Sequence, residues 1–229
     1  RSHKAILQPP AMKPTPLVMI LSKKAFCFFA GLLLSLCMVP SAQAQENEDG
    51  SRPEYKRPNF KTYTSLEDAL QYPDSVFILS LKGKKLTSIP EDVFKFKHLL
   101  VLDLSKNRIT ELPPTVGQFT DLVELDLSYN RITALPSEIG GMRSVRKLSL
   151  NRNSIATLPE SIGEMSSLEV IELWDNEIIE LPASMRNLKH LRLLELRGIL
   201  LSDEQHKEFQ ELLPETIIQM SPACNCKTR

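Results

Sequence analysis

The chain has 229 residues, about the length of one ordinary domain, and carries 28 basic and 28 acidic residues. This balance hides an uneven distribution, because residues 1–44 hold five basic residues and no acidic ones. Residues 45–229 keep 23 basic against 28 acidic residues, a net charge of −5. A mildly acidic protein has no bulk attraction to a phosphate backbone, so we expect no nucleic-acid partner.

Residues 19–44 have the pattern of a secretory signal peptide. Met19 opens a short basic start, residues 25–39 form an uncharged apolar run, and Ala42 and Ala44 supply small residues at the two cleavage positions. We therefore expect cleavage after Ala44, a secreted, periplasmic or cell-surface location, and no membrane span in the mature protein. A membrane anchor is the less favoured alternative, because about 20 apolar residues are needed to cross a bilayer.

Two further features of this region leave alternatives open. Residues 1–18 are interpreted as sequence upstream of the natural start or added to it, and Met12 competes with Met19 as that start. Lipid modification of Cys37 is a second alternative to simple cleavage. The large Leu36 before it disfavours this modification.

A linker and a cap are predicted before the first repeat. Residues 45–62 are polar and contain prolines, which is typical of a flexible linker. Residues 63–75 are interpreted as an N-terminal cap. Within them Thr64 stands three residues before Glu67, the spacing of a capping box, which predicts a short helix that Pro73 ends.

A period of 23 residues then runs through residues 76–201. Five consecutive copies keep one register without an insertion, and a degenerate sixth copy begins at Leu191. Each copy contains Leu-x-Leu, the alternation of a short strand with one buried face. One such strand cannot bury its leucines alone, so neighbouring copies must stack into a continuous core. The pattern predicts parallel strands centred on residues 78–82, 101–105, 124–128, 147–151, 170–174 and 193–197.

Other repeated positions predict how each copy turns. An Asn follows most strands, and its side chain can satisfy backbone groups that would otherwise be buried without a partner. A Pro later in each copy ends the strand and fixes the return path. The stretch after it, such as residues 137–142, has room for one helical turn with Ile139 and Met142 facing inward. The predicted structural Asn residues are Asn107, Asn130, Asn153 and Asn176.

A second cap closes the repeats at residues 202–220. Ser202 or Asp203 is the expected N-cap of a helix, and residues 216–220 are apolar enough to add a final strand. Residues 221–229 form a tail with Cys224 and Cys226. Two thiols without a nearby His are too few for structural zinc, and the sequence leaves open whether they are free or form a cramped disulfide.

These motifs resemble the leucine-rich repeat family, in its 23-residue subclass with the pattern LxxLxLxxNxIxxLPxxI. The resemblance covers residues 76–201. It implies an α/β repeat solenoid, a horseshoe segment with a parallel concave sheet, short helical or 3-10 turns on the convex side, and helical caps. Lys84 and Ile199 replace the Asn in the terminal copies, which have only one neighbour each.

A solenoid of this kind would bind through the variable strand positions, whose side chains alternate with the core leucines. Trp174 is the strongest candidate, because it is the only Trp and Trp and Arg residues dominate protein–protein hot spots. The competing interpretation is that Trp174 only packs beneath Arg197 as a cation–π pair. The predicted partner-binding residues are Trp174, Arg197, Asn151, Tyr129, Glu172, Asp126, Asp103, Glu124 and Lys147.

The acidic residues of this face form a stripe, Asp103, Asp126, Glu172 and Glu195. With basic residues alongside, such a stripe is typical of a solvated lattice of ion pairs; the expected cations are Lys85, Arg108 and Arg131. Calcium would need clustered oxygen ligands, which single carboxylates on separate strands do not supply. We expect no metal site.

Catalysis has little support in the sequence. The three His residues after residue 44 lie in different elements, and there is no phosphate-binding glycine loop or zinc signature. We therefore expect no enzymatic activity and no cofactor.

The preferred interpretation is a secreted, monomeric bacterial protein whose concave face binds another protein. Candidate partners include host and cell-surface proteins. The alternatives are an intracellular scaffold of the Ras-suppressor-like type and a structural surface spacer without a specific ligand.

Overall fold

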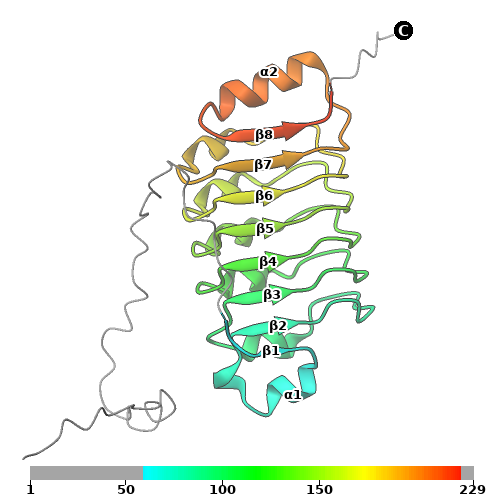
Figure 1. Cartoon of the computed structure of the whole chain (residues 1–229), viewed down its shortest axis with the longest axis vertical. Helices are drawn as coiled ribbons and strands as arrows, with labels where there is room; N and C mark the ends of the chain where they lie inside the picture. The colour runs from blue at the N-terminus through cyan, green and yellow to red at the C-terminus, as the bar shows by residue number, and fades with distance from the viewer. Residues whose placement is uncertain (1–58, 223–229) are drawn as a thin grey trace, which may run out of the picture. The chain divides into compact units, whose positions relative to one another are not determined.

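Eight parallel strands form one sheet in the computed structural model, which describes residues 59–222 (Figure 1). The predicted signal peptide, most of the predicted linker and the two C-terminal cysteines lie outside these residues. Each strand pairs with the next strand in the sequence, in the order β1 to β8. The strands are β1 (Thr62–Tyr63), β2 (Ile78–Ser80), β3 (Val101–Asp103), β4 (Glu124–Asp126), β5 (Lys147–Ser149), β6 (Val170–Glu172), β7 (Leu193–Leu196) and β8 (Ile217–Met220).

The 23-residue period sets the register of this sheet. Leu102 lies opposite Leu79 on one side and Leu125 on the other, and all three are fully buried. The leucines of neighbouring copies therefore stack into one continuous core, as the sequence predicted. This arrangement confirms the repeat solenoid as the fold class.

Short 3-10 helices lie behind the sheet in the view of Figure 1. In five of them a proline is the N-cap, where its fixed φ directs the chain back toward the next strand. Ile139 and Met142 are fully buried in and after the third of these five, which confirms the predicted inward turn. The 3-10 helices are η1 (Pro73–Ser75), η2 (Glu91–Lys95), η3 (Pro114–Gln118), η4 (Ser137–Gly141), η5 (Glu160–Glu164) and η6 (Ala183–Asn187).

The repeated Asn residues bridge neighbouring copies, as predicted. Asn107 Nδ2 donates to the carbonyl oxygens of Leu81 and Leu104 at 2.9 and 2.8 Å. Its Oδ1 accepts the backbone N–H of Leu86 at 3.0 Å. Each side chain thus satisfies backbone groups of two copies, and the same pattern recurs at Asn130, Asn153 and Asn176.

Most strands are shorter than predicted, three residues instead of five. In β3 the cause is visible at Ser105, whose backbone N–H is bonded to the Asp103 carboxylate at 3.0 Å and not to a neighbouring strand. Lys106 then takes a left-handed conformation, with φ 57°, which ends the extended backbone.

The N-terminal cap differs from the prediction in two ways. Helix α1 (Leu66–Leu70) is capped by Ser65, whose side chain accepts the N–H of Asp68 at 3.4 Å. The predicted capping box of Thr64 and Glu67 is therefore wrong by one residue, because Ser65 and Asp68 repeat the same spacing. Strand β1 was also not predicted, and it places Thr62, the last residue of the supposed linker, in the sheet.

The C-terminal cap agrees with the prediction. Ser202 is the N-cap of helix α2 (Asp203–Leu212) and forms a reciprocal capping box with Gln205. Phe209 and Leu213 are buried against the core, and β8 extends the sheet beside β7. No helix among residues 59–222 is long and apolar enough to cross a membrane.

Candidate functional site

The candidate site is the outer sheet face, formed by the strand side chains that alternate with the core leucines. Of the predicted partner-binding residues, Arg197 is exposed, Tyr129 is 38% exposed, and Trp174 is partly exposed. Asp103, Asp126, Lys147 and Glu172 are also partly exposed. Glu124 and Asn151 are only 6% and 7% exposed, so the expectation that both offer contact surface is wrong.

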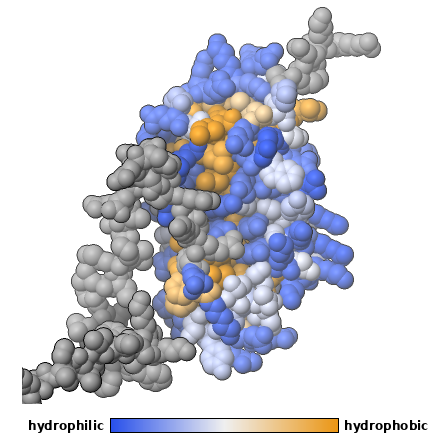
Figure 2. Space-filling view, viewed as in Figure 1, coloured by the Kyte–Doolittle hydropathy of each residue, from blue (hydrophilic) through white to orange (hydrophobic). Residues whose placement is uncertain are grey.

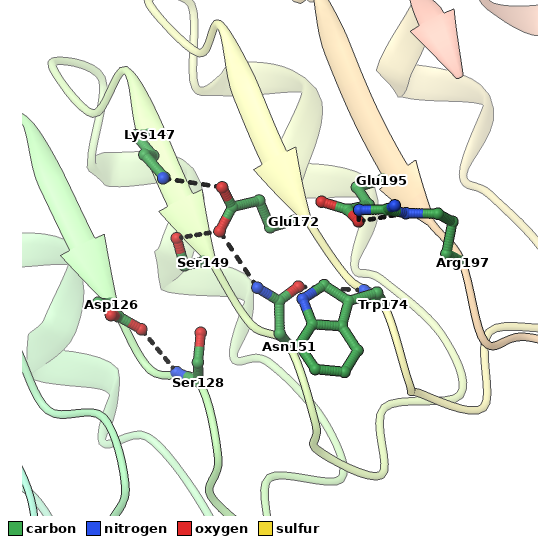
Figure 3. A network of polar contacts seen from close by, with 9 residues as sticks. All are labelled: Asp126, Ser128, Lys147, Ser149, Asn151, Glu172, Trp174, Glu195 and Arg197. Atoms are coloured by element: carbon green, nitrogen blue, oxygen red, sulfur yellow. Dashed lines mark hydrogen bonds and ion pairs between the residues drawn. The ribbon is translucent and has the colours of Figure 1, made fainter. Parts of the chain in front are cut away.

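Glu172 organises the polar centre of this face (Figure 3). Its Oε1 lies 2.7 Å from Lys147 Nζ, and its Oε2 accepts hydrogen bonds from Ser149 Oγ at 2.8 Å and Asn151 Nδ2 at 3.1 Å. The carboxylate is thus neutralised and held by three side chains of β5 and the turn that follows it. Lys147 and Glu172 are part of a local ion pair and not two independent contact residues.

Asn151 connects this centre to Trp174. While its Nδ2 binds Glu172, its Oδ1 accepts the backbone N–H of Trp174 at 3.1 Å. The buried Asn151 therefore fixes the backbone from which the indole projects. Asn151 therefore supports Trp174 and offers little exposed surface of its own.

Trp174, Tyr129 and Arg152 form an aromatic–cation cluster at the ends of β4, β5 and β6. The Tyr129 and Trp174 rings meet edge to face, with centroids 6.1 Å apart and an angle of 86°. The Arg152 guanidinium carbon lies 5.0 Å from the Trp174 ring centre and 5.2 Å from that of Tyr129. Both distances are within the range of a cation–π interaction.

The cation beside Trp174 is therefore Arg152, and the predicted pairing with Arg197 is wrong. Arg197 turns to its own strand, where its Nε donates to Glu195 Oε1 at 2.6 Å. Arg152 also forms an ion pair with Asp175, with Nε and Oδ2 3.0 Å apart. A carboxylate on one side and two rings on the other fix the guanidinium in place.

A column of left-handed turns builds this cluster. Lys106, Tyr129, Arg152 and Asp175 occupy one position of successive repeats, and all have φ between 53° and 59°. The terminal copies have Gly83 and Gly198 at this position, also with positive φ. A non-glycine residue there costs about 1–2 kcal/mol, so the four side chains occupy a conformation that glycine would adopt more easily.

The acidic stripe is only partly neutralised. Glu172 is paired with Lys147 and Glu195 with Arg197. Asp103 instead accepts hydrogen bonds from Ser80 and Ser105, and Asp126 accepts the backbone N–H of Ser128 at 2.9 Å. No ion pair reaches Asp103 or Asp126 from any residue of the described range 59–222.

The expected lattice with Lys85, Arg108 and Arg131 is therefore wrong, because no ion pair within residues 59–222 joins these cations to the stripe. Burial raises the pKa of the Asp126 carboxyl above its ordinary value. The bonds from Ser128 oppose this shift, while the charges of Asp103 and Glu172 add to it. The Asp126 end of the stripe thus keeps uncompensated negative charge.

Within the part of the chain that the structure describes, no three His, Cys, Asp or Glu side chains are grouped so that they could hold a metal ion. His98 and His190 are exposed, whereas His206 on α2 is half-buried.

Sequence reasoning missed Arg152, which completes the cluster. The repeat itself carried a signal, because Lys106, Tyr129 and Arg152 stand exactly one period apart. The left-handed turn places these side chains beside the outer sheet face, and the hydropathy pattern does not predict such a turn. Of these three residues, therefore, only Tyr129 was predicted to bind a partner.

Comparison with protein families gives two matches. Residues 78–154 match the model described as a leucine-rich repeat region, and residues 143–201 match the model described as leucine rich repeat. The matches together span residues 78–201. No curated protein matches the chain.

Two solved structures are similar to the chain. An internalin C2 from Listeria monocytogenes is 21% identical with a TM-score of 0.55, covering 66% of this chain and 64% of its own. A leucine-rich-repeat protein of Leptospira interrogans is 22% identical with a TM-score of 0.45, covering 70% of this chain and 58% of its own. The chain thus spans less than two thirds of either protein, and at these identities the similarity concerns the fold alone.

Proposed function

Because the chain belongs to the leucine-rich repeat family, a scaffold generally used for protein–protein interaction, we propose that it is an exported, non-enzymatic module that binds another protein. The outer sheet face is the binding surface in this proposal. From β2 to β7 this face is about 24 Å wide at the usual strand spacing, which suits a protein segment or a small domain.

The observation that carries the proposal is the aromatic–cation cluster of Trp174, Tyr129 and Arg152. Trp, Tyr and Arg are the residue types most enriched in interface hot spots. Here all three are at least partly exposed, and they come from three successive repeats. Such a cluster offers a large apolar contact area together with a guanidinium at its edge.

The cluster is also held by local contacts, which favours binding. Asn151 holds the Trp174 backbone, and Asp175 holds the Arg152 guanidinium. Side chains that are already ordered lose less conformational entropy when a partner binds, so more of the contact energy appears as affinity.

Export is part of the same proposal and rests on residues 19–44. Their basic start, apolar run and small cleavage residues support a signal peptide. N-terminal mass analysis of the natural protein tests this step. A mature N-terminus at Gln45 supports export, and an intact Met19 start in cytosolic material contradicts it.

The binding proposal is tested with Trp174→Ala, using a partner isolated from the native environment. Binding should weaken by at least about 2 kcal/mol, or roughly 30-fold, because Trp174 is the central anchor. The denaturation midpoint should change little, since the neighbouring Ile171 and Leu173 form the core and Trp174 does not.

Tyr72→Ala is the matched control, because Tyr72 is 60% exposed and lies beside η1, outside the outer sheet face. It should leave binding unchanged. Normal binding by Trp174→Ala together with a large loss of stability would show that the indole is only a packing residue.

A further inference from the structure

The outer sheet face is acidic at β3 and β4. Asp103 and Asp126 lie opposite each other in the register of these strands, and within residues 59–222 their side chains are bonded only to serine hydroxyls and backbone N–H groups. Two strands further on, Glu172 has Lys147 as a cation, so uncompensated charge is confined to one end of the stripe. An incoming cation at this end would relieve the repulsion between the two carboxylates.

The opposite end of the same face is apolar. Val170, Leu193 and Ile217 lie opposite one another in β6, β7 and β8. Val170 and Leu193 are partly exposed and Ile217 is 66% exposed. Figure 2 shows apolar surface over this part of the sheet. The nearby carboxylate of Glu195 is paired with Arg197, so no unpaired charge of the stripe lies beside the apolar strip.

We propose that the occupant of this face is an extended protein segment with a Lys or Arg side chain on Asp126 and an aliphatic or aromatic side chain on Leu193 and Ile217. The inference rests on the proposed function and adds the chemistry of the partner. The Trp174 cluster lies between the two ends, on the turn that follows β6.

The strand spacing fixes the distance between the two partner residues. Asp126 on β4 and Leu193 on β7 are three strands apart across the sheet, about 14 Å, and two residues apart along it, about 7 Å, because Leu193 is in register with Glu124. Together these give about 16 Å. An extended segment advances about 3.3 Å per residue, so the cation and the apolar residue should stand about five positions apart. The net charge of −5 after residue 44 also disfavours acidic segments.

The test uses a random peptide library displayed on phage and selected against the full chain. Enriched peptides should carry Lys or Arg about five positions from a large apolar residue. Asp126→Asn keeps an oxygen acceptor for Ser128 and removes only the charge, so it should weaken the enriched synthetic peptides by about tenfold. Leu193→Ser should weaken them as well.

Glu208→Gln removes an exposed carboxylate on α2, away from the sheet, and should leave peptide binding unchanged. Enrichment of acidic or uncharged peptides, no enrichment at all, or equal binding by Asp126→Asn and the wild type would overturn the inference. Uncharged peptides that depend on Trp174 would still leave the proposed function standing. Cationic peptides indifferent to Trp174→Ala would uphold this inference and remove the proposed anchor.

Discussion

Replacing Asn130 by Ala tests whether the repeated Asn residues hold the solenoid together. Asn130 Oδ1 accepts the N–H of Ile109 at 3.0 Å, and Ile109 is fully buried. The Nδ2 group donates to the carbonyl oxygens of Leu104 and Leu127 at 3.1 and 2.9 Å. The substitution removes these three bonds at once, together with a longer one from Nδ2 to the carbonyl oxygen of Ser128 at 3.4 Å.

The three bonds are not equal in cost. Leu104 O and Leu127 O keep a second donor, from Asn107 and Asn153 in the neighbouring copies. The N–H of Ile109 has no such substitute, and a buried orphan donor costs about 1–3 kcal/mol. With the weakened carbonyl bonds added, we expect a loss of about 2–4 kcal/mol in the free energy of unfolding.

Urea unfolding followed by circular dichroism measures this loss as a lower midpoint at an unchanged slope. Asn187→Ala is the matched control, because Asn187 is exposed and its side chain makes no hydrogen bond within residues 59–222. It should change the free energy of unfolding by less than about 0.5 kcal/mol. Equal midpoints for Asn130→Ala and the wild type would refute the structural role of the repeated Asn residues.

Two further substitutions test the packing of the turns and the charge of the outer sheet face. In Gly163→Ala the new Cβ would lie 2.4 Å from the carbonyl oxygen of Ser184, so thermal unfolding should show a loss of about 1–3 kcal/mol, and an unchanged melting temperature would contradict the close approach. Burial raises the pKa of Asp126 above its ordinary value of 3.8. Ionised Asp126 therefore lowers the free energy of unfolding at a pH above the raised pKa, and this loss disappears as the pH falls below 3.8. Asp126→Asn should therefore have a higher urea midpoint than the wild type at neutral pH, and this difference should disappear in acid. A difference that grows as the pH falls would show that ionised Asp126 stabilises the fold.

The fold could be predicted from the sequence because the strongest sequence pattern, the 23-residue period of leucines, reflects directly how the core packs. Leu102 and Leu125 recur at the period of the solenoid, and each must face its counterpart in the next copy. The same holds for Asn130, whose bonds reach residues 21 and 26 positions earlier. Residues that recur at the 23-residue period are predicted well, since each has the same backbone and core neighbours in every copy.

The candidate site was predicted less completely because its contacts depend on side-chain direction. Trp174 was found from its type and column, but its cation is Arg152, whose place depends on a left-handed turn. Glu124 was expected on the surface from alternation alone, and it is buried. The sequence also could not distinguish Thr64 from Ser65 as the N-cap, since both offer a hydroxyl with an acidic residue three positions later.

Site-specific photo-crosslinking can show directly whether the outer sheet face binds a protein. A photoreactive residue at Lys147 on this face is compared with one at Glu138, which is exposed in η4 on the other side of the sheet. We expect that the partner is crosslinked from position 147 and that Trp174→Ala suppresses the adduct. Crosslinking from position 138 with none from position 147 would exclude the outer sheet face and place the interaction on the 3-10 helices.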